Sequence, residues 1–104
     1  MKTIDLSQSK NIHDMLVNAE FSVACVRAEG GGILKFIHAS LAQRDAFRAH
    51  LRKAQRLHNA KEMIPGERFS LEDNITRYLC SLDSGLSSDP DLGKGNNLIT
   101  VIRI

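Results

Sequence analysis

Short apolar runs and longer amphipathic stretches alternate along this chain. In the longer stretches, apolar residues recur every three or four positions, which is the period of a helix with a buried face. The expected helices cover residues 10–28, 40–59 and 70–82. The short runs are β-branched or nearly continuously apolar, as in buried strands. The expected strands cover residues 3–6, 33–38, 61–64 and 98–104.

This order of elements predicts one α/β domain over residues 1–104, a two-layer α+β sandwich of the form βαβαβ(α)β. Its four strands form a mixed sheet, and the helices pack mainly on one face of that sheet. Residues 84–97 are rich in Gly, Ser and Asn and predict a loop. The pattern leaves the strand order open.

The first helical stretch is apolar on two sides, so it needs two covers. Leu16 and Val23 lie on the side expected to face the sheet, and Val17 and Phe21 lie on the other side. The second cover is either the third helix, folded back over the first, or a second copy of the chain. We expect the third helix, because it carries an apolar stripe of its own. That helix is expected to bury Leu71, Ile75, Tyr78, Leu79 and Leu82.

Composition narrows the class of protein. The 104 residues are 42% hydrophobic and 25% charged, which is typical of a single globular domain. No apolar run approaches the roughly 20 residues that span a bilayer, and Asp5 interrupts the start of the chain where a signal peptide would be apolar. Cys25 and Cys80 lack metal-binding spacing, which favours buried free thiols in a cytoplasmic protein. We expect no metal, no cofactor and no membrane partner.

Positive charge is concentrated in the second predicted helix. The net charge is only +2, but this helix carries several basic residues and a single acid, Asp45. Arg48 and Arg52 are expected on its outer side, away from Phe47 and Leu51. Such a face binds a phosphate backbone, or else is simply solvated. The basic residues expected to contact nucleic acid are Lys35, Arg44, Arg48, Arg52, Lys53, Arg56 and Lys94.

His38 is the first candidate for chemistry. It ends the buried strand 33–38, and functional groups gather at the carboxyl ends of such strands. A histidine titrates near neutral pH, so it can act as a general base or bind phosphate. The structural alternative is a strand-end histidine that is hydrogen-bonded to the backbone. Ser40 with Gln43 predicts a capped helix start whose free N–H groups can also receive a phosphate.

Several local strings resemble the Smr (small MutS-related) domain over essentially the whole chain. Residues 4–6 (Ile-Asp-Leu) and 34–38 (Leu-Lys-Phe-Ile-His) match its first and second motifs. Residues 65–69 and 91–97 look like a longer bacterial variant of it. The resemblance implies nucleic-acid binding and, in some members, DNA nicking or RNA cleavage. Asp5 and His38 are the motif positions that carry over.

The departures from that family shape the functional prediction. Ser7 stands where the family has its first-motif histidine, and Ala39-Ser40-Leu41 replaces the Gly-x-Gly that follows the second. These losses predict a nucleic-acid-binding domain without efficient nuclease activity, for DNA or for RNA. One alternative is a protein-interaction or homodimerisation module on the same fold. Another is a residual endonuclease that uses His38 and Asp5.

Overall fold

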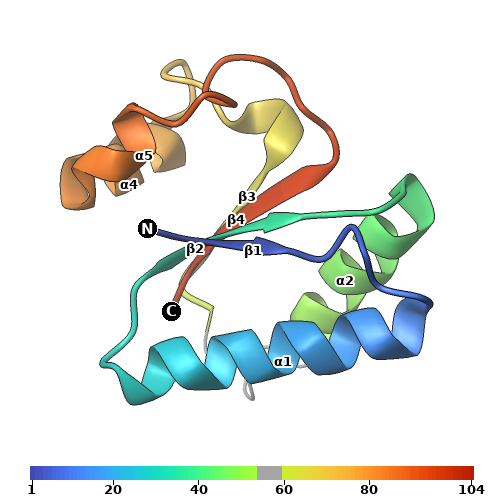
Figure 1. Ribbon diagram of the computed structural model, residues 1–104. Helices are drawn as coiled ribbons and strands as arrows, with labels where there is room; N and C mark the ends of the chain where they lie inside the picture. The colour runs from blue at the N-terminus through green and yellow to red at the C-terminus, as the bar shows by residue number, and fades with distance from the viewer. Residues whose placement is uncertain (54–59) are drawn as a thin grey trace.

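A four-stranded mixed sheet runs through the middle of the molecule (Figure 1). The computed structural model describes residues 1–53 and 60–104. The strands are β1 (Lys2–Asp5), β2 (Ile33–Ile37), β3 (Glu62–Pro65) and β4 (Ile99–Arg103). Their order is β1-β2-β4-β3; β1 and β2 are parallel, and β4 is antiparallel to both of its neighbours. The predicted α/β fold and mixed four-stranded sheet are confirmed.

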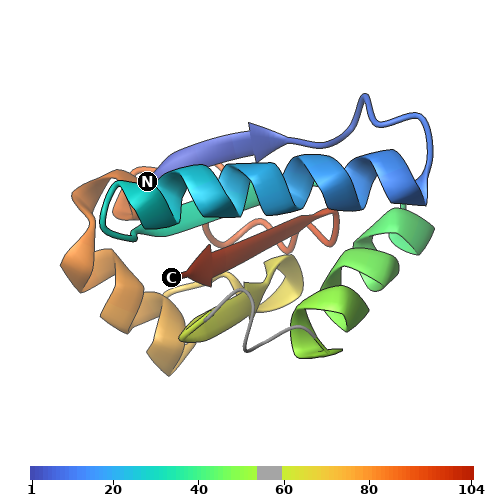
Figure 2. The ribbon, with the colours of Figure 1, turned by 90° about the horizontal axis from the view of Figure 1, so that it is seen from below.

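The two long helices lie on one face of this sheet, and the two short helices lie over the other (Figures 1 and 2). The long helices are α1 (Ile12–Ala28) and α2 (Leu41–Lys53). The short helices are α4 (Asn74–Leu82) and α5 (Ser84–Ser87), preceded by a 3₁₀ turn, η1 (Gly66–Arg68). Most of the helical structure is therefore on one face, as predicted. The end of the second predicted helix, at residues 54–59, lies outside the described residues.

The third predicted helix lies on the opposite face of the sheet from the one expected. Leu79 of α4 is fully buried, but it packs with Ile64 and Val101 on the sheet face opposite α1. Ile75 and Leu82, expected to be buried, are 42% and 52% exposed. The expectation that this helix covers α1 is therefore wrong. An apolar stripe says that a helix needs a partner, and here the uncovered face of the sheet is the partner.

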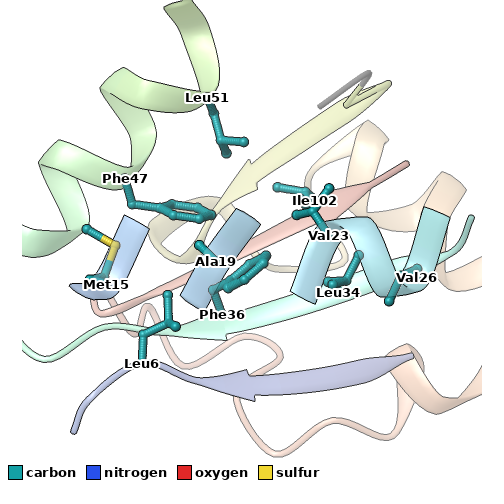
Figure 3. Packing of buried hydrophobic residues seen from close by; sticks show 10 residues of the cluster. All are labelled: Leu6, Met15, Ala19, Val23, Val26, Leu34, Phe36, Phe47, Leu51 and Ile102. Carbon is teal, nitrogen blue, oxygen red and sulfur yellow. The ribbon is translucent and has the colours of Figure 1, made fainter. Parts of the chain in front are cut away.

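The core between the sheet and the long helices is made of hydrocarbon (Figure 3). Alternate residues of a strand point to opposite faces, so Leu34 and Phe36 of β2 both point toward α1 and α2. The Phe36 ring lies 4.7 Å from the Phe47 ring, centroid to centroid. The buried members of this cluster are Leu6, Met15, Ala19, Val23, Val26, Leu34, Phe36, Phe47, Leu51 and Ile102.

Side-chain caps fix where the helices begin. The Asn11 side chain accepts a hydrogen bond from the Asp14 N–H and starts α1. The Asp73 side chain accepts one from the Thr76 N–H, so α4 begins at Asn74 and not at Ser70 as expected. Within the predicted loop, residues 84–87 form the single turn α5.

Cys25 and Cys80 are free thiols and only partly buried.

Candidate nucleic-acid interface

One edge of the sheet gathers most of the residues that the sequence singled out. Strands β1, β2 and β3 end there and β4 begins there, because β4 runs against its neighbours. The chain leaves β2 through His38, whose backbone N–H donates to the Leu98 carbonyl at 2.8 Å. Helix α2 starts three residues later, so its N-terminus faces the same edge. Loops from four parts of the chain meet at this edge.

His38 is buried within that edge and is only 2% exposed. Its Nε2 lies 2.8 Å from the Thr100 hydroxyl, and its ring lies 5.0 Å from that of Phe47. Burial, with the nearby charges of Arg48 and Arg44, lowers the pKa of His38 to about 4. The imidazole is therefore neutral at physiological pH. Its Nδ1 is buried and makes no hydrogen bond within the described residues.

Arg48 lies beneath the same edge and not on the outer side of α2. Its side chain is 8% exposed. Its Nε donates to the Thr100 hydroxyl at 3.1 Å, and its Nη2 donates to the Ile99 carbonyl at 3.0 Å. Both Nη atoms bond the Glu67 carboxylate, at 2.9 and 3.2 Å, and this pairing lowers the pKa of Glu67. The expectation that Arg48 projects outward is wrong, because Glu67 of η1 and polar groups at the start of β4 bond its guanidinium.

Asp5 is not a companion of His38. It is paired in register with Ile37, which packs on the α4 side of the sheet, whereas His38 packs on α2. The Asp5 carboxylate is exposed and accepts the Ser7 N–H at 2.8 Å. Hydrogen bonds from Ser7 lower the pKa of Asp5. Asp5 thus acts as a turn residue after β1, and the structure does not bring the two candidate catalytic groups together.

Lys35 is buried on the α4 side of the sheet and is 4% exposed. Its Nζ pairs with Asp89 at 2.9 Å and also with Asp91. Burial disfavours the charged amine, but the two carboxylates outweigh burial, so the pKa of Lys35 is raised. Lys35 therefore anchors the loop before β4 to the middle of the sheet. It does not present a free cation to a nucleic acid.

Ser40, Arg44 and Lys94 do lie at the loop edge with access to solvent. The Ser40 hydroxyl accepts the Gln43 N–H at 3.2 Å, which is the helix cap that the sequence predicted. Arg44 Nη1 donates to the Asn97 carbonyl at 3.1 Å, and the same guanidinium pairs with Asp45 at 2.7 Å. Lys94 is exposed on the loop that this bond joins to α2. The start of α2 and the loop of Lys94 are thus held side by side.

Two further cations stand at the other end of α2. Arg52 and Lys53 are exposed, and within residues 1–53 and 60–104 the structure gives neither of them an ion pair. Arg56 lies outside the described residues. Arg44 and Arg52 are eight residues apart, which is about 12 Å along a helix. Of the described basic residues predicted to contact nucleic acid, Lys35 and Arg48 are buried, and Arg44 is partly buried and paired with Asp45. The exposed ones are Arg52, Lys53 and Lys94.

Two residues of this site, Thr100 and Glu67, were not expected from the sequence. Thr100 is fully buried and is the shared partner of His38 and Arg48. The one available signal was a lone hydroxyl between apolar residues of the terminal strand, because a buried hydroxyl needs a polar partner. Glu67 had no comparable signal, since it is paired across 19 residues of chain.

Two other classes of site are absent from the part of the chain that the structure describes. No three His, Cys, Asp or Glu side chains come together there as a possible set of metal ligands. No described helix is long and apolar enough to cross a membrane. The exposed polar groups of the loop edge and of α2 are therefore the site on which a function can be argued.

Comparisons with family models, with curated proteins and with solved structures give no match for this chain. The fold is that of a small α/β domain with long helices on one face of a mixed sheet.

Proposed function

We propose that this protein is a nucleic-acid-binding domain of the Smr type, in its longer bacterial form, that does not cleave its ligand efficiently. The observation that carries the proposal is the bond between Arg44 and the Asn97 carbonyl. It holds the N-terminus of α2 beside the loop that bears Lys94. N–H groups at a helix start and flanking cations together are suited to binding a phosphate.

Contacts along α2 would extend this site. A phosphate at Ser40 and Arg44 leaves Arg52 and Lys53 two turns further on, where they can meet phosphates of the same backbone. Neutralising several phosphates makes binding salt-dependent and insensitive to sequence. The one tyrosine, Tyr78, lies on α4, across the sheet from α2, so base stacking is not part of the proposal.

The state of the two candidate catalytic residues supports binding without efficient cleavage. A general base must reach the proton that it removes, and must be neutral and accessible. His38 is neutral but 2% exposed, and Asp5 belongs to the other side of the sheet. A residual endonuclease therefore has no assembled pair of groups to use.

The free thiols Cys25 and Cys80 accord with the proposed cytoplasmic location.

The test is a gel-shift titration with duplex DNA, single-stranded DNA and structured RNA at about 50 and about 200 mM salt. We expect binding that weakens steeply at the higher salt. Arg52→Glu/Lys53→Glu and Lys94→Glu should each weaken it at least about tenfold, because they reverse exposed charges at the interface. Lys2→Glu/Arg77→Glu is the matched control for the double variant, with the same change of charge on β1 and α4, and Lys2→Glu alone is the control for Lys94→Glu.

Two results would contradict the proposal. One is no binding to any of the three nucleic acids at the lower salt. The other is equal weakening by the interface variants and by the control, which would mean that net charge alone is at work. Robust cleavage that disappears in His38→Ala would instead show that the nuclease has survived in this chain.

A further inference from the structure

The outer face of α1 is an apolar surface that no described element covers. In the view from below, α1 lies in front of the sheet with nothing drawn in front of it (Figure 2). Phe21 is 71% exposed and Val17 is 51% exposed. Ala24 and Ala28 are exposed as well. Spacings of four, three and four residues place these side chains on one stripe, which we call the α1 stripe.

This stripe is distinct from the side of α1 that builds the core. Met15, Ala19 and Val23 are buried against the sheet and belong to the opposite side of the helix. A soluble monomer seldom leaves a continuous apolar stripe on a helix that is already buried on its other side. The stripe therefore points to a partner.

We propose that the partner is a second copy of this chain, with the two α1 helices packed antiparallel about a two-fold axis. Side-chain size along the stripe carries the first part of the argument. The large residues come first and the small residues come last. An antiparallel pair places Phe21 opposite the partner's Ala24 and Val17 opposite the partner's Ala28, so each large side chain meets a small one. A parallel pair stacks Phe21 on itself and leaves a gap between the alanines.

Charge complementarity along α1 also favours the antiparallel pair. Glu20 and Arg27 lie on the same flank of the stripe, seven residues apart, and both are exposed. In the antiparallel register just described, each Glu20 comes beside the partner's Arg27, and the contact is made twice because of the two-fold axis. Glu20 also bonds His50 Nε2 at 2.8 Å, which holds its carboxylate on this flank.

The extent of the surface predicts how strong the dimer is. A helix of 17 residues is about 25 Å long, so one helix pair buries less than the roughly 1,600 Å² of a standard interface. We therefore expect a dimer that dissociates on dilution. No nucleic acid is involved, so this inference stands or fails independently of the proposed function.

Sedimentation or light scattering across a range of protein concentrations tests the proposal. The unaltered protein should approach about 23 kDa, twice the chain mass of 11.6 kDa, at the highest concentrations. Phe21→Asp should stay at the monomer mass with an unchanged circular dichroism spectrum, because Phe21 makes no core contact. Its melting temperature should match that of the unaltered protein at high dilution, where both are monomers. Leu82→Asp is the matched control on α4 and should still dimerise.

A charge swap tests the register even if Phe21→Asp folds poorly. Glu20→Arg and Arg27→Glu should each weaken the dimer about tenfold, and the two together should restore it, because the partners have only exchanged places. A chain that is monomeric at every concentration would overturn the proposal. So would a folded Phe21→Asp that still dimerises, or a double swap that is weaker than either single change.

Discussion

The two faces of the sheet are held in different ways. Between the sheet and the long helices most contacts are hydrocarbon, from two helices whose periodicity is plain in the sequence (Figure 3). The buried polar groups of this face, Arg48, His38 and Thr100, lie together where β2 ends and β4 begins. On the α4 side the helices are short, and buried charge adds to the apolar contacts. Lys35 there pairs with two aspartates, and Arg103 pairs with Glu62 at 2.6 Å. Local pattern thus specifies one face, whereas pairs distant in sequence specify much of the other.

The largest loss of stability should come from a substitution between the sheet and the helices α1 and α2, which we call the hydrocarbon face. Phe47→Ala removes a ring that is 1% exposed and that contacts Phe36 and His38. The lost contacts and the cavity should lower the free energy of unfolding by about 3–5 kcal/mol. Urea denaturation measures it, with Leu41→Ala as the control, because Leu41 is 49% exposed on the same helix. Similar midpoints for both variants would mean that Phe47 is not part of the core.

A comparable loss of stability is expected on the α4 side of the sheet, which we call the charged face, but by a different mechanism. Lys35→Met leaves Asp89, whose side chain is 4% exposed, without its cation, which should lower the free energy of unfolding by about 3 kcal/mol. Adding Asp89→Asn should recover much of that loss, because a neutral amide tolerates burial better than an unpaired carboxylate. If the second change adds a further loss instead, packing rather than charge is what Lys35 contributes.

Lowering the pH should lower the free energy of unfolding, because His38 is buried in its neutral form. Its pKa is about 4 in the folded state and 6.5 in the unfolded chain, so only the unfolded chain takes up a proton as the pH falls from 6.5 to 4. Stability is therefore intact above pH 6.5 and falls by about 2–3 kcal/mol by pH 4. Denaturation of the protein and of His38→Gln at several pH values measures it. The variant should show a flatter profile between pH 6.5 and pH 5, and parallel profiles would exclude His38 as the cause.

The smallest losses of stability should come from removing helix caps, and they should be similar on the two faces of the sheet. Asn11→Ala and Asp73→Ala each remove the side-chain cap of one helix, α1 on the hydrocarbon face and α4 on the charged face. Each should lower the free energy of unfolding by about 1 kcal/mol, because a cap acts locally whatever the helix packs against. A thermal melt of each variant checks this. A much larger effect at Asp73 would indicate that α4 is less stable by itself than α1.

The helices and strands could be predicted from the sequence because their signals are local. A period of three to four residues located α1 and α2, and continuous apolar runs located β2 and β4. The position of α4 could not be predicted in this way. Its apolar residues signalled burial, but which surface buries Leu79 depends on the sheet order, which no short segment encodes.

The candidate site shows the same limit. Arg48 and Arg52 are four residues apart on one helix, and nothing in the local sequence distinguishes them. Arg48 is buried because Glu67 and Thr100 reach it from 19 and 52 residues away. Lys35 is buried for a similar reason, 54 residues from Asp89. Ser40, whose cap is local, took the role that its neighbours in the sequence predicted.

The strand order also has a consequence for the time at which the chain can fold. Strand β4 comes last in the described chain, but it lies inside the sheet, between β2 and β3. Until residues 99–103 leave the ribosome, β3 has no neighbour, and β2 exposes an unpaired edge beside apolar side chains such as Phe36. Such edges are prone to aggregate. Folding during synthesis must therefore wait for β4, and a chain that stalls before this strand should be a target for chaperones.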